Sequence, residues 1–311
     1  FARLAETRWG AFMNRSFASW LTQSPGGAVF ATGLLGLLPL FGLGFAFFLP
    51  GAVPALVSLV RGPKLGLAVA LGATMLLTLA MWTIGRPVPA GLIYSAWVLG
   101  PPLALSAVLA RTRSLSMCLQ LAVLAGVVLL VFLHVKLGDP AKFWAPFVRD
   151  LAEEMQKRGL PMDLEKDGLA ETLARTLWGW VTALTILLAM CAIFLARWWQ
   201  TRLLPEDAGR FGAEFQQLRL GVVLGTVGAV LICASLFTDQ VLVDDMERIF
   251  LGALMLVGLA AAHRFKAAGR LNGVWLGAIY VLLVLAAPIM VAAMAGWGFV
   301  DNWLRSRPSA Q

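Results

Sequence analysis

The chain has 311 residues, of which 59% are hydrophobic and 14% charged, and its formal net charge is +8. Soluble globular proteins carry about 25% charged residues, so this composition excludes a surface that faces mainly water. The basic residues lie in short connections between apolar runs, where membrane topology explains them, so we expect no nucleic-acid binding. The composition predicts an all-α polytopic membrane protein in contact with a lipid bilayer.

The first segment, 1–24, is predicted to be an amphipathic helix at the membrane interface. Its apolar and basic side chains fall on different sides of a helix, an arrangement typical of helices that lie in the plane of the membrane. It has no compact apolar core or cleavage site, so we do not expect a cleavable signal peptide. A chain that begins with Phe1 is expected to lack a few leading residues. The helix is interpreted as a topological anchor, or alternatively as a docking site for a partner.

Apolar runs then fill most of the chain. A helix needs about 20 apolar residues to cross the hydrocarbon layer, and the candidate segments are 65–84, 89–110, 115–135, 177–197, 219–238, 248–264 and 271–297. The stretch 28–60 is long for one crossing and short for two, and its Pro and Gly residues favour a hairpin of two short or tilted helices. The sequence thus predicts a transmembrane helical bundle of eight or nine spans, without charged residues inside the runs.

Basic residues orient these spans. With a cytoplasmic N-terminus, the cytoplasmic connections hold 14 cations and 4 acids, and the other 11 cations and 13 acids fall outside. The positive-inside rule favours this orientation. Nine crossings put the C-terminus outside, where Arg305 and Arg307 fit poorly. The predicted domains are 1–24, an N-terminal membrane bundle over 28–135, an extracytoplasmic segment over 136–176, and a C-terminal membrane bundle over 177–303.

Residues 136–176 are predicted to form an amphipathic helical hairpin outside the membrane. One apolar stripe repeats every four residues, through Phe143, Phe147, Leu151 and Met155. Gly159 and Pro161 end the first helix. The hairpin is interpreted as a cap on its own bundle, and the stripe alternatively as a lid or partner surface.

Two other connections draw attention. Residues 198–218 form a predicted cytoplasmic loop that contains a short interfacial helix. Residues 239–247 form a predicted outer loop with four acids, Asp239, Asp244, Asp245 and Glu247. Four carboxylates are enough ligands for a divalent cation, but their spacing fits no known metal-binding loop. We therefore predict a solvated loop.

Catalytic motifs are missing from the sequence: there is no metalloprotease, serine-hydrolase or nucleotide-binding pattern. The two histidines, His134 and His263, lie at span ends on opposite predicted faces. We expect no enzyme, no cofactor and no metal. The predicted spans also lack the buried carboxylate that ion-coupled transporters usually have.

Uncharged polar and aromatic side chains give the predicted ligand pocket, formed by Tyr94, Trp97, Gln120 and Tyr280. The amide of Gln120 needs a partner in hydrocarbon, which is either another helix or a bound small molecule. Gly221, Gly225 and Gly228 form a small-residue face that predicts close helix packing. Pro101 and Pro102 predict a bend or break in one span, and Pro288 predicts one in the last span.

Four motifs carry a family resemblance: FMNRSFASW at 12–20, RGPKLG at 61–66, LARWWQTRLLPEDAGRFGAEFQQLRLG at 195–221, and FVDNW at 299–303. Together they resemble the YybS-like family of bacterial inner-membrane proteins. The resemblance implies a multi-pass protein of the bacterial inner membrane, and it implies no reaction. The N-terminal half is similar to the substrate-binding subunits of energy-coupling-factor transporters, which implies capture of a small molecule from outside.

The leading functional hypothesis is a non-enzymatic binding or scaffolding subunit of a larger membrane assembly, with a membrane-protein partner. One alternative is a small-molecule capture subunit of a transporter. The other is a lipid-acting membrane enzyme, for which the acids of 239–247 offer the metal site.

Overall fold

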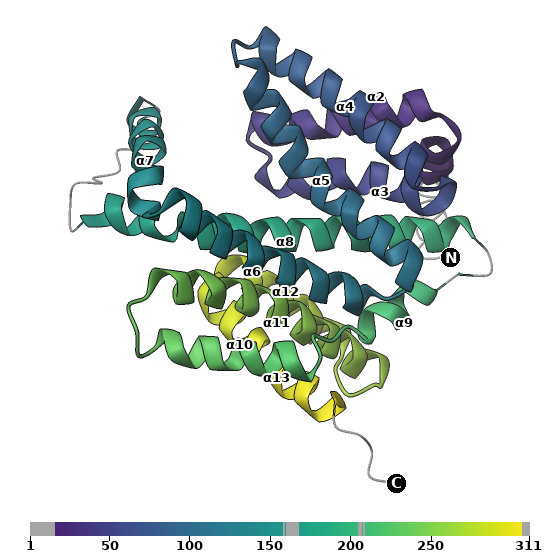
Figure 1. The fold of residues 1–311 in the computed structure, drawn as a ribbon. Coiled ribbons are helices and arrows are strands. Elements are labelled where there is room, and N and C mark those ends of the chain that lie inside the picture. The colour runs from purple at the N-terminus through teal and green to yellow at the C-terminus, as the bar shows by residue number, and fades with distance from the viewer. Residues whose placement is uncertain (1–15, 158, 160–167, 205–206, 208, 307–311) are drawn as a thin grey trace. The chain divides into compact units, whose positions relative to one another are not determined.

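The computed structural model describes residues 16–157, 159, 168–204, 207 and 209–306. All regular structure in these residues is helical, which confirms the predicted all-α class (Figure 1). The chain divides into two compact units. Unit 1 holds residues 1–119 and 187–218, and unit 2 holds residues 120–186 and 219–311. The predicted domains follow the chain order, whereas the two units interleave along it.

The predicted interfacial helix is described only in part, because residues 1–15 lie outside the described residues. A helix over Ser16–Gln23 is followed, after a bend of 114°, by the next apolar helix. Leu21 of this first helix is fully buried, and the ring of Phe17 lies 5.9 Å from that of Trp199. The described part therefore packs on unit 1 through one side.

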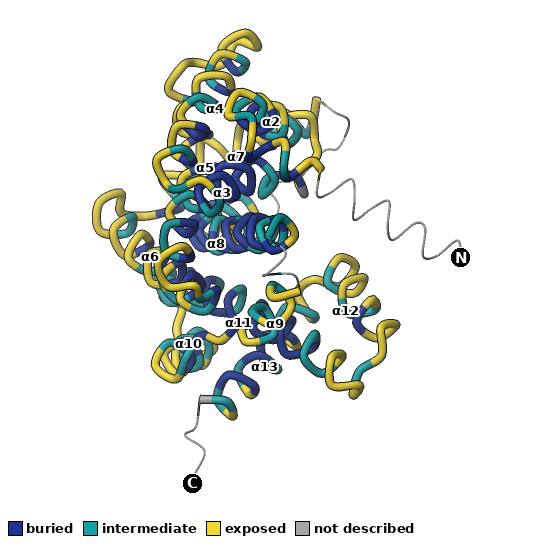
Figure 2. Tube along the Cα trace, turned by 90° about the vertical axis from the view of Figure 1, so that its right-hand side faces the viewer, coloured by how far each residue is buried: buried dark blue, intermediate teal, exposed yellow. Residues whose placement is uncertain are grey.

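Unit 1 is built around the helix α3. The predicted 28–60 hairpin folds as two short helices, α2 and α3, joined by two 3-10 turns. The elements of unit 1 are α2 (Pro25–Leu37), η1 (Leu38–Phe41), η2 (Gly44–Phe48), α3 (Leu49–Arg61), α4 (Pro63–Thr83), α5 (Val88–Thr112) and α9 (Arg210–Gln216). Residues Pro50–Ser58 of α3 are buried by α2, α4 and α5 (Figure 2). Short side chains permit this: a Cβ on Gly51 would meet the ring of Pro102 at 2.6 Å, and one on Gly66 would meet the Cβ of Ser58 at 2.6 Å.

Proline acts differently at the two predicted break points. α5 continues through Pro101 and Pro102 without interruption. Pro102 is buried and occupies the space that a side chain at position 51 would need, which the glycine there leaves open. The last apolar stretch does break: one helix ends at Leu285 and the next starts at Ala287, with Pro288 in its first turn. Proline lacks an N–H and is tolerated in a first turn.

Unit 2 is centred on α11. Its helices are α7 (Pro140–Lys157), α10 (Val222–Ser235), α11 (Val241–Ala267), α12 (Gly273–Leu285) and α13 (Ala287–Ser306). Parts of two further helices, α6 (Leu115–Leu137) and α8 (Leu169–Leu203), belong to it as well. α11 packs most extensively on α13. A Cβ on Gly258 would meet the carbonyl oxygen of Met294, and one on Gly298 would meet that of Leu254, so the two backbones are in contact.

Five described helices are long and apolar enough to cross a membrane: α4, α5, α6, α8 and α11. The bent pair Ser16–Gln23 and Pro25–Phe41 counts as a sixth candidate. These helices fit a multi-pass membrane protein, but the predicted eight or nine spans are not reached. The reason is length: α10 has 14 residues and α12 has 13, or about 20 Å each at 1.5 Å per residue, against about 30 Å of hydrocarbon.

The predicted single crossing over 271–297 is wrong. The stretch forms two helices, α12 and α13, that pack against each other. At the far end of α13, Asp301 contacts both Arg305, at 3.6 Å, and Arg264 in the last turn of α11. The ends of α11 and α13 therefore lie together, which gives Arg305 the same surroundings as Arg264.

The predicted outer loop over 239–247 is also mostly wrong, because α11 begins at Val241. Asp244, Asp245 and Glu247 lie in the first two turns of this helix. Carboxylates suit that position because unpaired backbone N–H groups give a helix N-terminus a partial positive charge. Acidic residues at this point thus mark the start of a helix.

Candidate functional site

The α7 helix begins at Pro140. Asp139 precedes Pro140, and its side chain accepts a hydrogen bond from the N–H of Ala141 at 2.9 Å. The helix ends at Lys157, two residues before Gly159, which has a positive φ of 74°. α8 then starts at Leu169 and continues through the predicted 177–197 span. Most of the connection between α7 and α8 lies outside the described residues.

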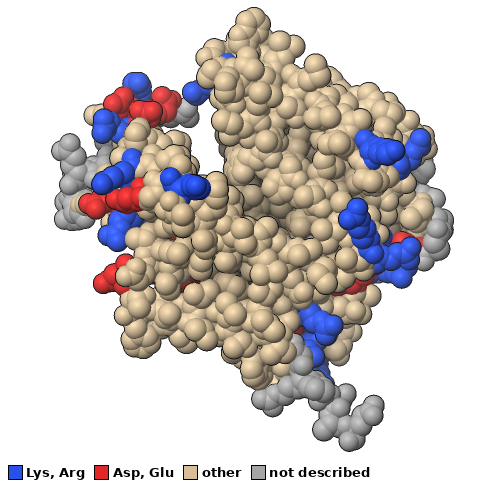
Figure 3. Space-filling view, in the orientation of Figure 1, with Lys and Arg blue, Asp and Glu red and all other residues tan. Residues whose placement is uncertain are grey.

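α7 buries one side and exposes another. Val148 is 4% exposed and packs with Trp144 and Ala152 against Ala174 of α8. Three apolar side chains of the predicted partner surface stay exposed: Phe143 (47%), Phe147 (50%) and Leu151 (45%). We call these three residues the α7 stripe. The fourth predicted member, Met155, is half-buried. Charged side chains of both signs gather around α7 (Figure 3).

A chain of aromatic contacts leads from the α7 stripe to α8 and α6. The ring of Phe143 lies 5.7 Å from that of Trp178 on α8. The Trp178 ring in turn lies 4.9 Å from the imidazole of His134, which stands in the last turn of α6. Three helices thus meet here through aromatic side chains.

Next to this chain, α11 contributes a buried carboxylate. Asp245 is fully buried. Its Oδ2 atom lies 3.4 Å from His134 Nε2, and its Oδ1 atom accepts a hydrogen bond from Arg248 Nη1 at 3.1 Å. The close approach requires Gly179 of α8, because a Cβ there would meet the Cα of Asp245 at 2.8 Å. Arg248 also lies over the ring of Trp180, 5.8 Å from its centroid.

This arrangement corrects the expectation of spans without a buried carboxylate, because Asp245 belongs to the candidate span α11. The prediction for His134 compares it only with His263 and names no other partner for it. A signal was present in the sequence: both His134 and Asp245 border apolar runs that the charge count places on the same side. The contact between the two residues depends on how α6 and α11 pack, which their positions along the chain do not show.

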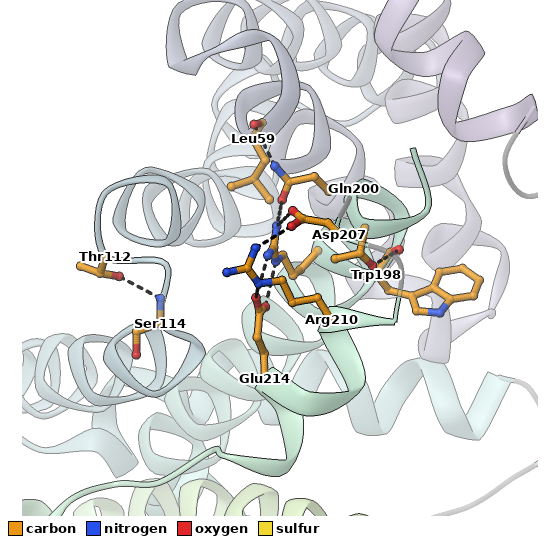
Figure 4. A network of polar contacts seen from close by, with 10 residues as sticks. Leu59, Thr112, Ser114, Trp198, Gln200, Asp207, Arg210 and Glu214 are labelled. Carbon is orange, nitrogen blue, oxygen red and sulfur yellow. Dashed lines mark hydrogen bonds and ion pairs between the residues drawn. The ribbon is translucent and has the colours of Figure 1, made fainter. Parts of the chain in front are cut away.

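A second polar cluster, in unit 1, is centred on the buried Arg197 and includes residues of the 198–218 segment. Arg197 donates from Nε and Nη2 to the two carboxylate oxygens of Glu214, at 2.8 and 2.7 Å (Figure 4). Its Nη1 atom donates to Gln200 at 2.7 Å and to Asp207 at 3.4 Å. We call Arg197, Gln200, Asp207, Arg210 and Glu214 the Arg197 network.

The Arg197 network ties α8 and α9 to α3. Gln200 Nε2 donates to the carbonyl oxygen of Leu59, in the last turn of α3, at 3.1 Å. Arg210 donates to Asp207 at 2.7 Å, and this hydrogen bond holds the pKa of Asp207 below its ordinary value, with help from the charges of Arg197 and Arg210. The predicted short helix therefore exists as α9, and it packs on α8 through Phe211, Phe215 and Phe194.

The four predicted ligand residues are divided between the units. In unit 1, Tyr94 donates to the carbonyl oxygen of Gly36 at 2.7 Å, and Phe47 packs on both Tyr94 and Trp97. In unit 2, Gln120 donates to the carbonyl oxygen of Arg219 at 3.5 Å, and the hydroxyl of Tyr280 lies 2.8 Å from His263 Nε2. Each of the four polar or aromatic groups thus has its own protein neighbour.

The three predicted packing glycines lie at helix contacts of unit 2. The N–H of Gly221 donates to Asn302 Oδ1 at 3.0 Å, and Asn302 Nδ2 donates back to the Gly221 carbonyl at 2.9 Å. A Cβ on Gly225 would meet the same Asn302 side chain. One on Gly228 would meet the ring of Phe250 at 2.6 Å. Gly225 and Gly228 therefore admit no side chain unless their neighbours move, and Gly221 has a positive φ of 82°, which favours glycine.

A shallow apolar groove of about 430 Å³ runs beside α10 and α13. Its lining is Thr226, Ala229, Val230, Cys233, Ala234, Phe237, Phe299 and Trp303. None of the predicted ligand residues lines it. In the described part of the chain, no three His, Cys, Asp or Glu side chains come together as a metal site.

Comparison with known proteins found no protein that is significantly similar to this chain. No family model matches the chain, and neither a curated protein nor a solved structure is significantly similar to it.

Proposed function

We propose that this protein is a non-enzymatic binding or scaffolding subunit of a larger membrane assembly, and that the α7 stripe contacts its membrane-protein partner. The observation that carries the proposal is the division of α7 into a buried side and an exposed apolar line. Phe143, Phe147 and Leu151 follow at intervals of four residues, so they form one continuous line on a helix. Exposed apolar lines rimmed by charge are typical of interaction sites.

The proposed setting is the bacterial inner membrane, with the N-terminus in the cytoplasm and α7 outside. The positive-inside count supports this orientation. The grouping of Arg264 and Arg305 around Asp301 supports it further, because both cations then belong to one side. The resemblance to YybS-like proteins agrees with this setting.

Capture of a small molecule is the weaker alternative. Tyr94 and Trp97 belong to unit 1, whereas Gln120 and Tyr280 belong to unit 2. Within unit 2, the latter two contact different groups. The groove beside α10 and α13 has an apolar lining, which suits a lipid chain better than a polar metabolite.

The proposal is tested with photoreactive cross-linkers placed at two adjacent residues of α7 in native membranes. Phe147 is 50% exposed and Val148 is 4% exposed, so the second position is a matched buried control. We expect a cross-link to one defined protein from position 147 and none from position 148. Cross-links from position 147 to lipid alone would show that α7 lies on the membrane surface, and the proposal would be wrong.

A substitution then tests whether the contact holds the assembly together. Phe147→Asp is expected to abolish co-purification of the cross-linked protein, because a charge in an apolar contact costs desolvation energy. Glu153→Lys, on the exposed charged part of the same helix, serves as the control. Retention of the partner by Phe147→Asp would contradict a role for the α7 stripe.

A further inference from the structure

We propose that His134 and Asp245 share one bound proton and form a proton-binding site in unit 2. The inference starts from the burial of the pair. Asp245 is 0% exposed and the His134 side chain is 15% exposed. Asp245 Oδ2 and His134 Nε2 are both buried, lie 3.4 Å apart, and have no hydrogen-bond partner elsewhere among the described residues.

The second step fixes the tautomer of His134. Its Nδ1 atom lies 3.0 Å from the carbonyl oxygen of Leu130. A carbonyl oxygen only accepts hydrogen bonds, so Nδ1 must carry a hydrogen atom. In a neutral imidazole the other nitrogen, Nε2, is then a bare acceptor.

The third step concerns what faces Nε2. An ionised carboxylate has only acceptor sites, so a neutral His134 would direct a lone pair at the lone pairs of Asp245 Oδ2. Two unpaired acceptors facing each other in a buried site are costly. One added proton removes the conflict, either as an imidazolium beside a carboxylate or as a carboxylic acid that donates to a neutral imidazole. Both forms hold the same number of protons, so the pair as a whole carries one.

The charged groups around the pair do not occupy the position between Asp245 Oδ2 and His134 Nε2. On α11, Arg248 donates to Asp245 Oδ1, the oxygen that does not face His134, and Asp244 is the preceding residue. α6 contributes His134 itself. α8 contributes the uncharged residues Trp178 and Gly179 at the contact. The Oδ2 side of Asp245 is thus left to His134 and the shared proton.

A proton held between two candidate spans is a part found in proton relays and ion-coupled membrane proteins. The inference does not depend on the α7 stripe as a partner surface, since the pair lies beneath it on other helices. Its test and the cross-linking test can therefore fail separately.

The experiment uses the full chain in lipid nanodiscs with ¹⁵N-labelled histidine. The chain has two histidines, so two imidazoles give signals, and His263→Gln assigns them. At pH 7 we expect His134 to show protonated Nδ1 and an Nε2 that binds or shares a proton. In Asp245→Asn the amide can donate to Nε2, so we expect Nε2 without its own proton. Asp244→Asn, the matched control, should leave the His134 signal unchanged.

A wild-type Nε2 without a bound proton at pH 7 would overturn the proposal, and so would identical His134 signals in the wild type and Asp245→Asn. The His263 signal reports folding in Asp245→Asn and Asp244→Asn, because its partner Tyr280 lies on α12. If Asp245→Asn does not fold, the wild-type protonation of Nε2 decides alone.

Discussion

The two buried polar clusters differ in how completely they are satisfied. In the Arg197 network the guanidinium group donates to Glu214, Gln200 and Asp207. Gln200 in turn donates to the carbonyl oxygen of Leu59 at the end of α3. At His134 and Asp245, one atom of each side chain has no ordinary hydrogen bond among the described residues. A network in which every polar atom is hydrogen-bonded stabilises the fold. A network with unpaired buried polar atoms gains free energy when it binds a further group, here a proton.

The largest expected effect is the loss of stability from Arg197→Met. The substitution removes the buried cation that donates to Glu214, Gln200 and Asp207, while the more exposed Arg210 stays beside both carboxylates. We expect a loss of about 3 kcal/mol, at the lower end of the range for a buried ion pair that loses one partner. Equilibrium unfolding of the purified protein measures it. Arg202→Met, which removes a stacking cation over Trp198 one turn further on, should cost less than about 1 kcal/mol. Equal losses would show that the Arg197 network has no special structural role.

Gly179→Ala is expected to come next, because the added methyl group would meet the backbone of Asp245. Overpacking of this kind costs about 1–3 kcal/mol. Gly212→Ala in α9 is the control, since no atom lies within 4 Å of its added Cβ, and an alanine there should be neutral or stabilising. A harmless Gly179→Ala would mean that α8 and α11 are further apart than described.

Asp245→Asn should change stability little at pH 7, by less than about 1 kcal/mol, because the amide replaces the shared proton with its own donor. Thermal unfolding of the variant and of Asp245→Ala separates the two contributions. The alanine is expected to be the less stable, since it leaves Arg248 and His134 without a partner. A large loss in Asp245→Asn alone would indicate a purely structural ion pair, like that of Arg197.

The smallest expected effect is the acid sensitivity of the Arg197 network. The pKa of Asp207 is lowered in the folded protein, so its contribution is present above the ordinary aspartate pKa of about 3.9 and is lost as the pH falls through the folded value. Asp207→Asn should therefore be less stable than the wild type at pH 6, and the difference should shrink toward pH 3. Thermal unfolding across this range measures it; a difference independent of pH would contradict the assignment.

Some sequence expectations failed for reasons that lie in particular residues. The break in the last apolar stretch was visible as Pro288, but its consequence, that Arg305 returns to Arg264, needed the packing of α13 on α11. The acids of 239–247 were visible in the sequence too, but the sequence did not show that Asp245 is fully buried while Asp244 and Glu247 are only partly buried. Gly258 and Gly298, which allow the closest backbone contact in unit 2, are 40 positions apart and have no local signature.

The sequence by itself determined the helical class and the membrane character of this protein, because apolar length and charge placement act locally along each segment. It also indicated the amphipathic helix α7, since an apolar side chain every four residues is a local signal. Only the tertiary structure decided which helix ends meet, and therefore that His134 faces Asp245 and that Arg197 gathers three partners. The contacts of His134 with Asp245 and of Arg197 with Glu214 join residues from different helices. Their free energy depends on burial and on a geometry that cannot be read from spacing along the chain.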